Sequence, residues 1–182
     1  MVKWATRLGP SRDIPGLTMN HPIALCVPSA LLLSCGLAFA QAPRPACAIL
    51  EALDLKPLLG AGHAAPAPYA DNGCIVKSAT PGRLVLLQVA EKPNAQLKKD
   101  MAAFKKTLSG PEYTKISTVA PAPQFGPEAF SAREKGDQSA AEIHAVKGGH
   151  AVSVTLNSEG RIGEPVFKQL GELTSAVLAK LP

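Results

Sequence analysis

The pattern of apolar and polar positions is clearest over residues 141–157, where two alternating stretches flank the pair Gly148-Gly149. A two-residue Gly-Gly loop suits a hairpin turn whose residues need positive φ, and it would place Lys147 opposite His150. Counted outward from this turn, apolar residues meet on one side of the ribbon: Ala145 with Val152, Ile143 with Val154, and Ala141 with Leu156. The pattern predicts a hairpin with one face in the core.

A second pattern, with apolar residues three or four positions apart, covers residues 164–181. This spacing predicts an amphipathic helix. Glu164 and Pro165 suit the first turn of such a helix, and Lys180 suits the last. The helix would cover the apolar face of the hairpin with Val166, Leu170, Leu173, Val177 and Leu181.

Residues 94–108 predict another amphipathic helix, with Asn94 as its cap and Gly110-Pro111 after its end. Its apolar stripe is Leu97, Met101, Phe104 and Leu108, and its other face carries Lys98, Lys99, Lys105 and Lys106. A basic face can contact phosphate or anionic lipid. Asp100 lies among these lysines and no Trp or Tyr does, so a solvated face is favoured.

The remaining pattern predicts strands over residues 74–78, 84–90, 113–119 and 128–133, and two helical turns over 47–60. Asp54 would cap the second of these turns. Residues 61–73 and 120–127 are rich in Pro, Ala and Gly and predict loops. Together the elements predict an α+β domain: an antiparallel sheet of about six strands with a C-terminal meander, helices mainly on one face, and the amphipathic helix at the C-terminus.

An almost wholly apolar run over residues 23–40 includes Ala38 and Ala40, placed as the small residues that signal peptidase recognises. We therefore expect residues 19–40 to be a secretory signal peptide, cleaved between Ala40 and Gln41. Residues 41–182 would then form a single mature domain. Residues 1–18 are a doubtful extension, because Met19 stands directly before the apolar run and offers a second start.

Two alternatives exist for the same apolar run. Leu33-Ser34-Cys35 resembles a lipoprotein cleavage box, in which Cys35 would become the lipidated first residue. A retained membrane anchor is the other, although Pro28 and Gly36 interrupt a run near the lower limit of length for a span. All three interpretations place the domain outside the cytoplasm, as a periplasmic, secreted or membrane-anchored protein.

Cys47 and Cys74 are the only cysteines in the expected mature domain, since Cys26 and Cys35 lie in the apolar run. Two cysteines in an oxidising compartment most simply form one structural disulfide. A redox or metal site is the alternative. It needs a partner at ligand spacing, and the nearest candidate, His63, lies in the 61–73 loop without such spacing.

The net charge disfavours a nucleic-acid partner, and the chain lacks the common catalytic and phosphate-binding motifs. The formal charge of +5 falls to +3 without the first 40 residues, which hold three basic residues and one acidic residue; this is too little for a nucleic-acid interface. The chain has no nucleophile elbow, phosphate-binding loop, zinc-protease motif or Cys-x-x-Cys. We therefore predict no catalytic, cofactor-binding or metal-binding residue.

His144 and His150 have opposite parity in the hairpin, so they should not converge on one metal ion, and we interpret both as surface histidines. The acidic residues at turns and strand ends offer no recognisable hydrolytic pair: Glu128, Glu134, Asp137, Glu142, Glu159 and Glu164. The two Pro-rich loops, 61–72 and 120–127, are the best candidate binding edges, with plain linkers as the alternative.

Several short features follow one another along the chain: Cys47, then Leu58-Leu59-Gly60, Cys74, a strand, a helix, a Gly-Pro-Glu-Ala-Phe segment at 126–130 and a Val-x-Val strand after the Gly-Gly turn. In this order the chain resembles the small exported bacterial domains of unknown function that often occur as lipoproteins. The resemblance implies a single disulfide, an α+β fold and an extracytoplasmic location, and it implies no established activity.

The sequence thus predicts an exported module, without enzymatic activity or cofactor, that binds a protein, an envelope component or a small ligand. One alternative is an exported hydrolase with an unrecognised carboxylate site. Another is an envelope lipoprotein anchored through Cys35. Contact with a membrane is expected only through the signal or a lipid anchor.

Overall fold

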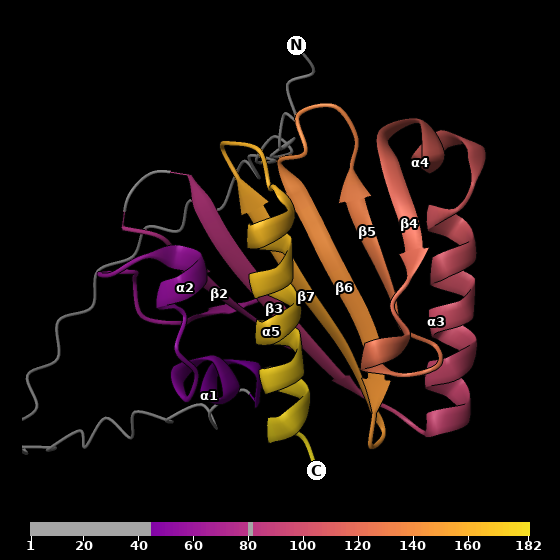
Figure 1. Ribbon diagram of the computed structural model, residues 1–182. Coiled ribbons are helices and arrows are strands. Elements are labelled where there is room, and N and C mark those ends of the chain that lie inside the picture. The colour runs from indigo at the N-terminus through magenta and orange to yellow at the C-terminus, as the bar shows by residue number, and fades with distance from the viewer. Residues whose placement is uncertain (1–44, 80–81) are drawn as a thin grey trace, which may run out of the picture. The chain divides into compact units, whose positions relative to one another are not determined.

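The structure, a computed structural model, describes residues 45–79 and 82–182, which belong to one compact unit. Within these residues seven strands form one antiparallel sheet: β1 (Ala67–Tyr69), β2 (Gly73–Lys77), β3 (Arg83–Glu91), β4 (Ser117–Pro121), β5 (Phe130–Glu134), β6 (Ala140–Lys147) and β7 (His150–Ser158). Their order across the sheet is β1-β2-β3-β7-β6-β5-β4 (Figure 1). The α+β class and the C-terminal meander β4 to β7 are therefore confirmed.

The hairpin of β6 and β7 has the predicted register. Lys147 pairs with His150, Ala145 with Val152, Ile143 with Val154 and Ala141 with Leu156. Gly148 and Gly149 both have positive φ, at 55° and 81°, as a two-residue turn of this kind requires. The apolar members of these pairs are all buried, so the predicted core face is confirmed.

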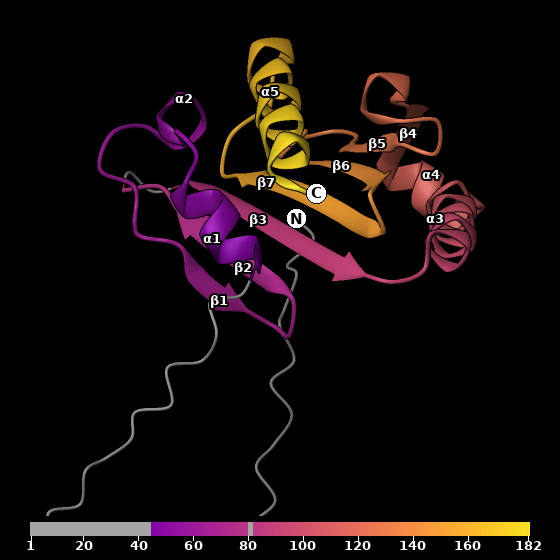
Figure 2. The same cartoon turned by 90° about the horizontal axis from the view of Figure 1, so that it is seen from below.

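Three helices cover that core face: α1 (Pro45–Glu51), α2 (Lys56–Leu59) and α5 (Glu164–Lys180). Figure 2 shows them together on one side of the sheet. Beneath these three helices lie alternate residues of β3 and β7, among them Val85, Leu87 and Leu156, each wholly buried. The predicted C-terminal helix is confirmed, and it buries Leu170, Leu173, Thr174, Val177 and Leu178.

A disulfide between Cys47 and Cys74 joins α1 to β2, with 5.1 Å between the two Cα atoms. Both cysteines lie in the core. Because the bridge links residues 27 positions apart, loop-closure entropy gives it a stabilising contribution of about 3.5 kcal/mol. The predicted structural disulfide is therefore confirmed.

The second face of the sheet is covered only in part, by α3 (Asn94–Leu108), which contacts β6 and β7. Leu97 and Met101 are buried beneath it, whereas the Phe104 side chain is 42% exposed. Towards β2 and β3 the same face carries half-exposed apolar residues that no helix covers, including Leu84 and Leu86. The uncovered region next to α3 is where the candidate site lies.

Three predictions about the elements are wrong. Residues 113–116, expected to begin a strand, belong to the short helix α4 (Pro111–Ile116), because Pro111 starts a helical turn directly after Gly110. The expected loop 61–73 contains the short strand β1, so the sheet has seven strands where about six were predicted. Asn94 does not cap α3: its Oδ1 accepts a hydrogen bond from the Gly149 N–H at 2.9 Å, and Pro93 holds the cap position.

Other expectations fall on residues that the structure does not describe. These are the extension 1–18, the signal peptide 19–40, the cleavage site at Ala40 and Gln41, and lipidation at Cys35. Among the described residues, none of the helices has the length and apolar character needed to cross a membrane.

Candidate functional site

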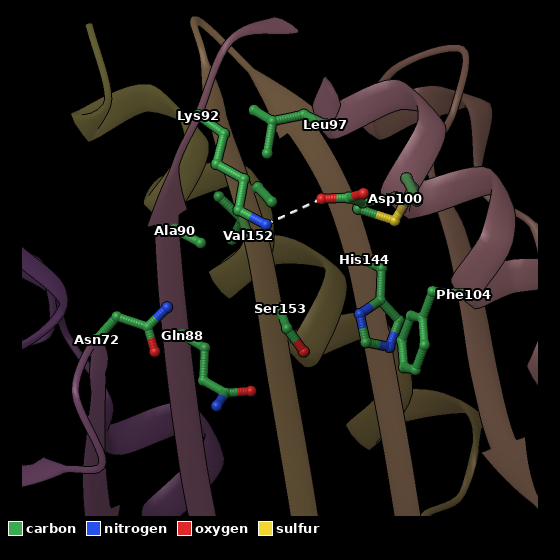
Figure 3. A pocket seen from close by; sticks show the side chains of 12 residues that line it. Asn72, Gln88, Ala90, Lys92, Leu97, Asp100, Phe104, His144, Val152 and Ser153 are labelled. Atoms are coloured by element: carbon green, nitrogen blue, oxygen red, sulfur yellow. Dashed lines mark hydrogen bonds and ion pairs between the residues drawn. The ribbon is translucent and has the colours of Figure 1, made fainter. Parts of the chain in front are cut away.

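A groove of about 260 Å³ opens on the second face of the sheet, between α3 and the strands β3, β7 and β6 (Figure 3). Its α3 wall is apolar and consists of Leu97, Met101 and Phe104. Ala90 and Ala151 pair directly on its floor, so small side chains there leave room under the helix. The sheet side of the groove is more polar.

The polar side chains of the groove form a row across the strands. Gln88 on β3 pairs with Ser153 on β7, and Ser153 pairs with His144 on β6. Directly paired residues on one face of a sheet lie about 4.8 Å apart from strand to strand. Asn72, next to the residue that pairs with Gln88, extends the row beyond β3. Four polar side chains therefore line one groove.

Three of these side chains have unused hydrogen-bonding capacity. Within the part of the chain that the structure describes, the side chains of Asn72, Gln88 and Ser153 bond to no other residue. Gln88 and Ser153 are nevertheless half-buried. Half-buried amides and hydroxyls without protein partners are available to a ligand.

His144 has a fixed position at the end of this row. Its side chain is only 6% exposed, and its Nε2 lies 2.9 Å from Oε2 of Glu142. Its ring stacks on Phe130 at 4.7 Å between centroids and meets Phe104 edge-on at 5.0 Å. The interpretation of His144 as a surface histidine is wrong, because α3 covers this part of the sheet and strand parity does not reveal that cover.

The bond to Glu142 also determines what His144 offers to the groove. A carboxylate can only accept, so Nε2–H donates to Glu142. In the neutral ring Nδ1 is then an acceptor, and Figure 3 shows this nitrogen turned towards Ser153. While its ring is neutral, His144 therefore presents a hydrogen-bond acceptor to the groove.

The charged residues at the rim of the groove are paired with one another. Nζ of Lys92, just after β3, lies 2.9 Å from Oδ2 of Asp100 on α3, as the dashed line in Figure 3 marks. The Gln96 amide donates to the other oxygen of Asp100 at 2.6 Å. The hydrogen bonds from Lys92 and Gln96 lower the pKa of Asp100 below its ordinary value of 3.8, and the bond from Lys92 has the larger effect. The two charged side chains at the rim thus form an ion pair with each other.

Comparison with known proteins adds no assignment to this site. No family model, curated protein or solved structure matches the chain. The proposed function therefore rests on the groove and the residues around it.

Four of the six acidic residues named from the sequence have local partners. Glu128 pairs with Lys98 at 3.1 Å, and Glu164 pairs with Arg133. Glu134 accepts from the Ser139 N–H at 3.0 Å. Of the six, Glu142 reaches a residue of the groove beside α3, His144. Glu134 and Glu164 line a common hollow together with Arg133, away from that groove.

The other two histidines of the described residues, His63 and His150, lie apart from the groove. His150 Nδ1 lies 3.0 Å from the Gly148 carbonyl oxygen, and His63 Nδ1 lies 3.1 Å from that of Ala64. The described residues contain no group of three His, Cys, Asp or Glu side chains that could hold a metal ion.

The two loops predicted as binding edges contribute residues to different grooves. Only Asn72 of loop 61–72 lines the groove beside α3. Residues of loop 120–127 line a second groove, of about 460 Å³, beside α5 and on the opposite face of the sheet. Gly171 of α5 faces this second groove, where an added Cβ would lie 3.4 Å from Cζ of Phe125.

Sequence reasoning missed Gln88 and Ser153 as site residues. The hairpin register already places His144 and Ser153 on one face. Gln88 joins this face through the pairing of β3 with β7. The sequence does not reveal that pairing, because the two strands lie more than 50 residues apart.

Proposed function

We propose that this protein is an exported, non-enzymatic binding module whose ligand site is the groove between α3 and the sheet. The observation that carries the proposal is the row of Asn72, Gln88 and Ser153, whose polar side chains line a partly apolar groove and have no partner among the described residues. Ligand sites typically combine apolar walls with a few convergent polar groups. The groove has both.

Export is supported by two features. The apolar run before Ala40 has the pattern of a secretory signal, and the buried disulfide between Cys47 and Cys74 suits an oxidising compartment. We expect the intact mass of the protein from its own host to correspond to a chain that begins at Gln41. A chain that begins at a modified Cys35 would identify an envelope lipoprotein, and a mass that includes residues 19–40 would contradict cleavage.

A fragment screen by ¹⁵N–¹H NMR tests the binding function. Compounds that bind should shift the amide signals of β3, β7 and the first half of α3 as one cluster. Hits that cluster instead around α5 and residues 120–125 would move the site to the opposite groove. A library without any saturable hit would contradict the binding function.

The oriented His144 favours a second candidate, an exported hydrolase. A histidine that a carboxylate orients, beside a serine hydroxyl, has the parts of a nucleophile and its general base. However, the structure has no hydrogen bond between Ser153 and His144, which such a pair needs. Turnover of p-nitrophenyl acetate that disappears in both Ser153→Ala and His144→Gln would favour this candidate over binding alone.

A further inference from the structure

We propose that the groove binds a small uncharged molecule that carries an amide group and an apolar substituent. This inference deepens the proposed function and rests on it. It names the chemistry of the ligand from the charges, the hydrogen-bonding groups and the apolar wall of the groove.

The charges of the groove argue for an uncharged ligand. Of the described residues, Lys92 and Asp100 are the only charged ones that line it, and they are bonded to each other. A charged ligand would have to leave water without gaining an opposite charge, unless it broke this pair. A neutral ligand does not have that cost.

The hydrogen-bonding groups argue for an amide. The carboxamides of Asn72 and Gln88 each offer donors and acceptors, and the Ser153 hydroxyl offers both as well. His144 Nδ1 adds an acceptor at the end of the row, so a ligand there must supply a donor. An amide supplies an N–H donor and a C=O acceptor together without any charge.

The opposite wall argues for an apolar substituent. Leu97, Met101 and Phe104 of α3 face the polar row across the groove. The volume, about 260 Å³, is at the small end of the usual range for ligand pockets. A compact aliphatic group, or the apolar face of one sugar ring, would fit between the wall and the polar row.

An amide of this kind has two possible sources, a peptide and an N-acetylated sugar. N-acetyl-leucinamide represents the first source, and N-acetylglucosamine represents the second. N-acetylleucine and leucinamide serve as charged controls, because each keeps the leucine side chain and one amide but has a carboxylate or an ammonium group in place of the other amide.

The experiment is an NMR titration of the intact disulfide-bonded protein with these four probes. At least one neutral probe should bind with shifts at Gln88, Ser153 and Met101, and the two leucine controls should bind at least about tenfold more weakly than N-acetyl-leucinamide if that is the active probe. Gln88→Leu and Ser153→Ala should each weaken binding by about fivefold to tenfold, the usual effect of one lost hydrogen bond. Gln124→Leu, the same change in the opposite groove, should have no effect.

Three results would overturn the inference. Tighter binding of a charged control in the groove would refute the neutral ligand but leave the binding function standing. Binding of the neutral probes that Gln88→Leu and Ser153→Ala both leave unchanged would refute the role of the polar row. No binding by either neutral probe would refute the amide class, while the wider fragment screen would still decide whether the groove binds ligands at all.

Discussion

Single residues connect the fold to the candidate site. His144 is one of the four buried polar residues in the described chain, and its ring is held by Phe130, Phe104 and Glu142 together. In the proposed site, a neutral His144 ring in this position would define where a ligand places a donor, opposite Nδ1. The same contacts make it important for stability.

We expect His144→Ala to lower the free energy of unfolding by roughly 2–4 kcal/mol, because it leaves a cavity beneath α3 and removes the ring contacts and the bond to Glu142. His150→Ala, at the other end of the hairpin, should cost less than about 1 kcal/mol. Urea denaturation of both variants measures the difference. Equal losses of stability in the two variants would show that the contacts around the His144 ring contribute nothing to the free energy of unfolding.

Gly148 shows a second constraint on a single residue. A Cβ there would lie 2.2 Å from the Pro182 carbonyl oxygen, in addition to the strain of φ at 55°. Gly136 also has positive φ, at 75°, but nothing lies within 4 Å of the added atom. Gly136→Ala should therefore cost about 1 kcal/mol from backbone strain alone, and Gly148→Ala clearly more. If both variants unfold at the same urea concentration, the turn is not packed against the C-terminal residue.

At the scale of elements, the turn of the β6–β7 hairpin is a point where two helices meet the sheet. The Lys147 ammonium donates to the Leu178 carbonyl oxygen at 2.7 Å, near the end of α5. The Gly149 N–H donates to Asn94, at the start of α3. One turn is therefore bonded both to the end of α5 and to the start of α3, the helix that forms one wall of the groove.

The sequence predicts those elements best whose pattern is local. The hairpin register, the two long helices and the disulfide follow from periodicity, turn residues and cysteine count. α4 was missed because Tyr113, Thr114 and Ile116 favour strands, while Gly110-Pro111 starts a helical turn. β1 was missed because three residues with Pro68 in the middle have no strand pattern. The site was missed because it depends on β3 pairing with β7.

The Lys92–Asp100 pair joins the end of β3 to α3, and its effect depends on pH. The pKa of Asp100 is lowered in the folded state, so the pair stabilises the fold above the ordinary value of 3.8 and loses this effect as pH falls through the lower folded value. We expect an NMR titration of the Asp100 carboxyl to have a midpoint below 3.8, and Lys92→Met to move it upward. A midpoint unchanged by Lys92→Met would show that the pair does not form in solution.

At the scale of the whole described unit, the two faces of the sheet have different roles. One face is closed by α1, α2 and α5 and holds the core, including the disulfide (Figure 2). The other is closed only at the α3 side and leaves the polar row accessible. The first face thus supplies the apolar contacts that stabilise the fold, and the second face carries the polar row that we propose as the ligand site.

The most direct test is a crystal structure of the disulfide-bonded protein, soaked in separate crystals with N-acetyl-leucinamide and with N-acetylglucosamine. The proposal predicts at least one of the two compounds between α3 and the strands β3 and β7, with its amide bonded to Gln88 or Ser153 and its apolar part against Met101 and Phe104. A groove that stays empty in both crystals, or compounds bound only beside α5 on the opposite face, would contradict it.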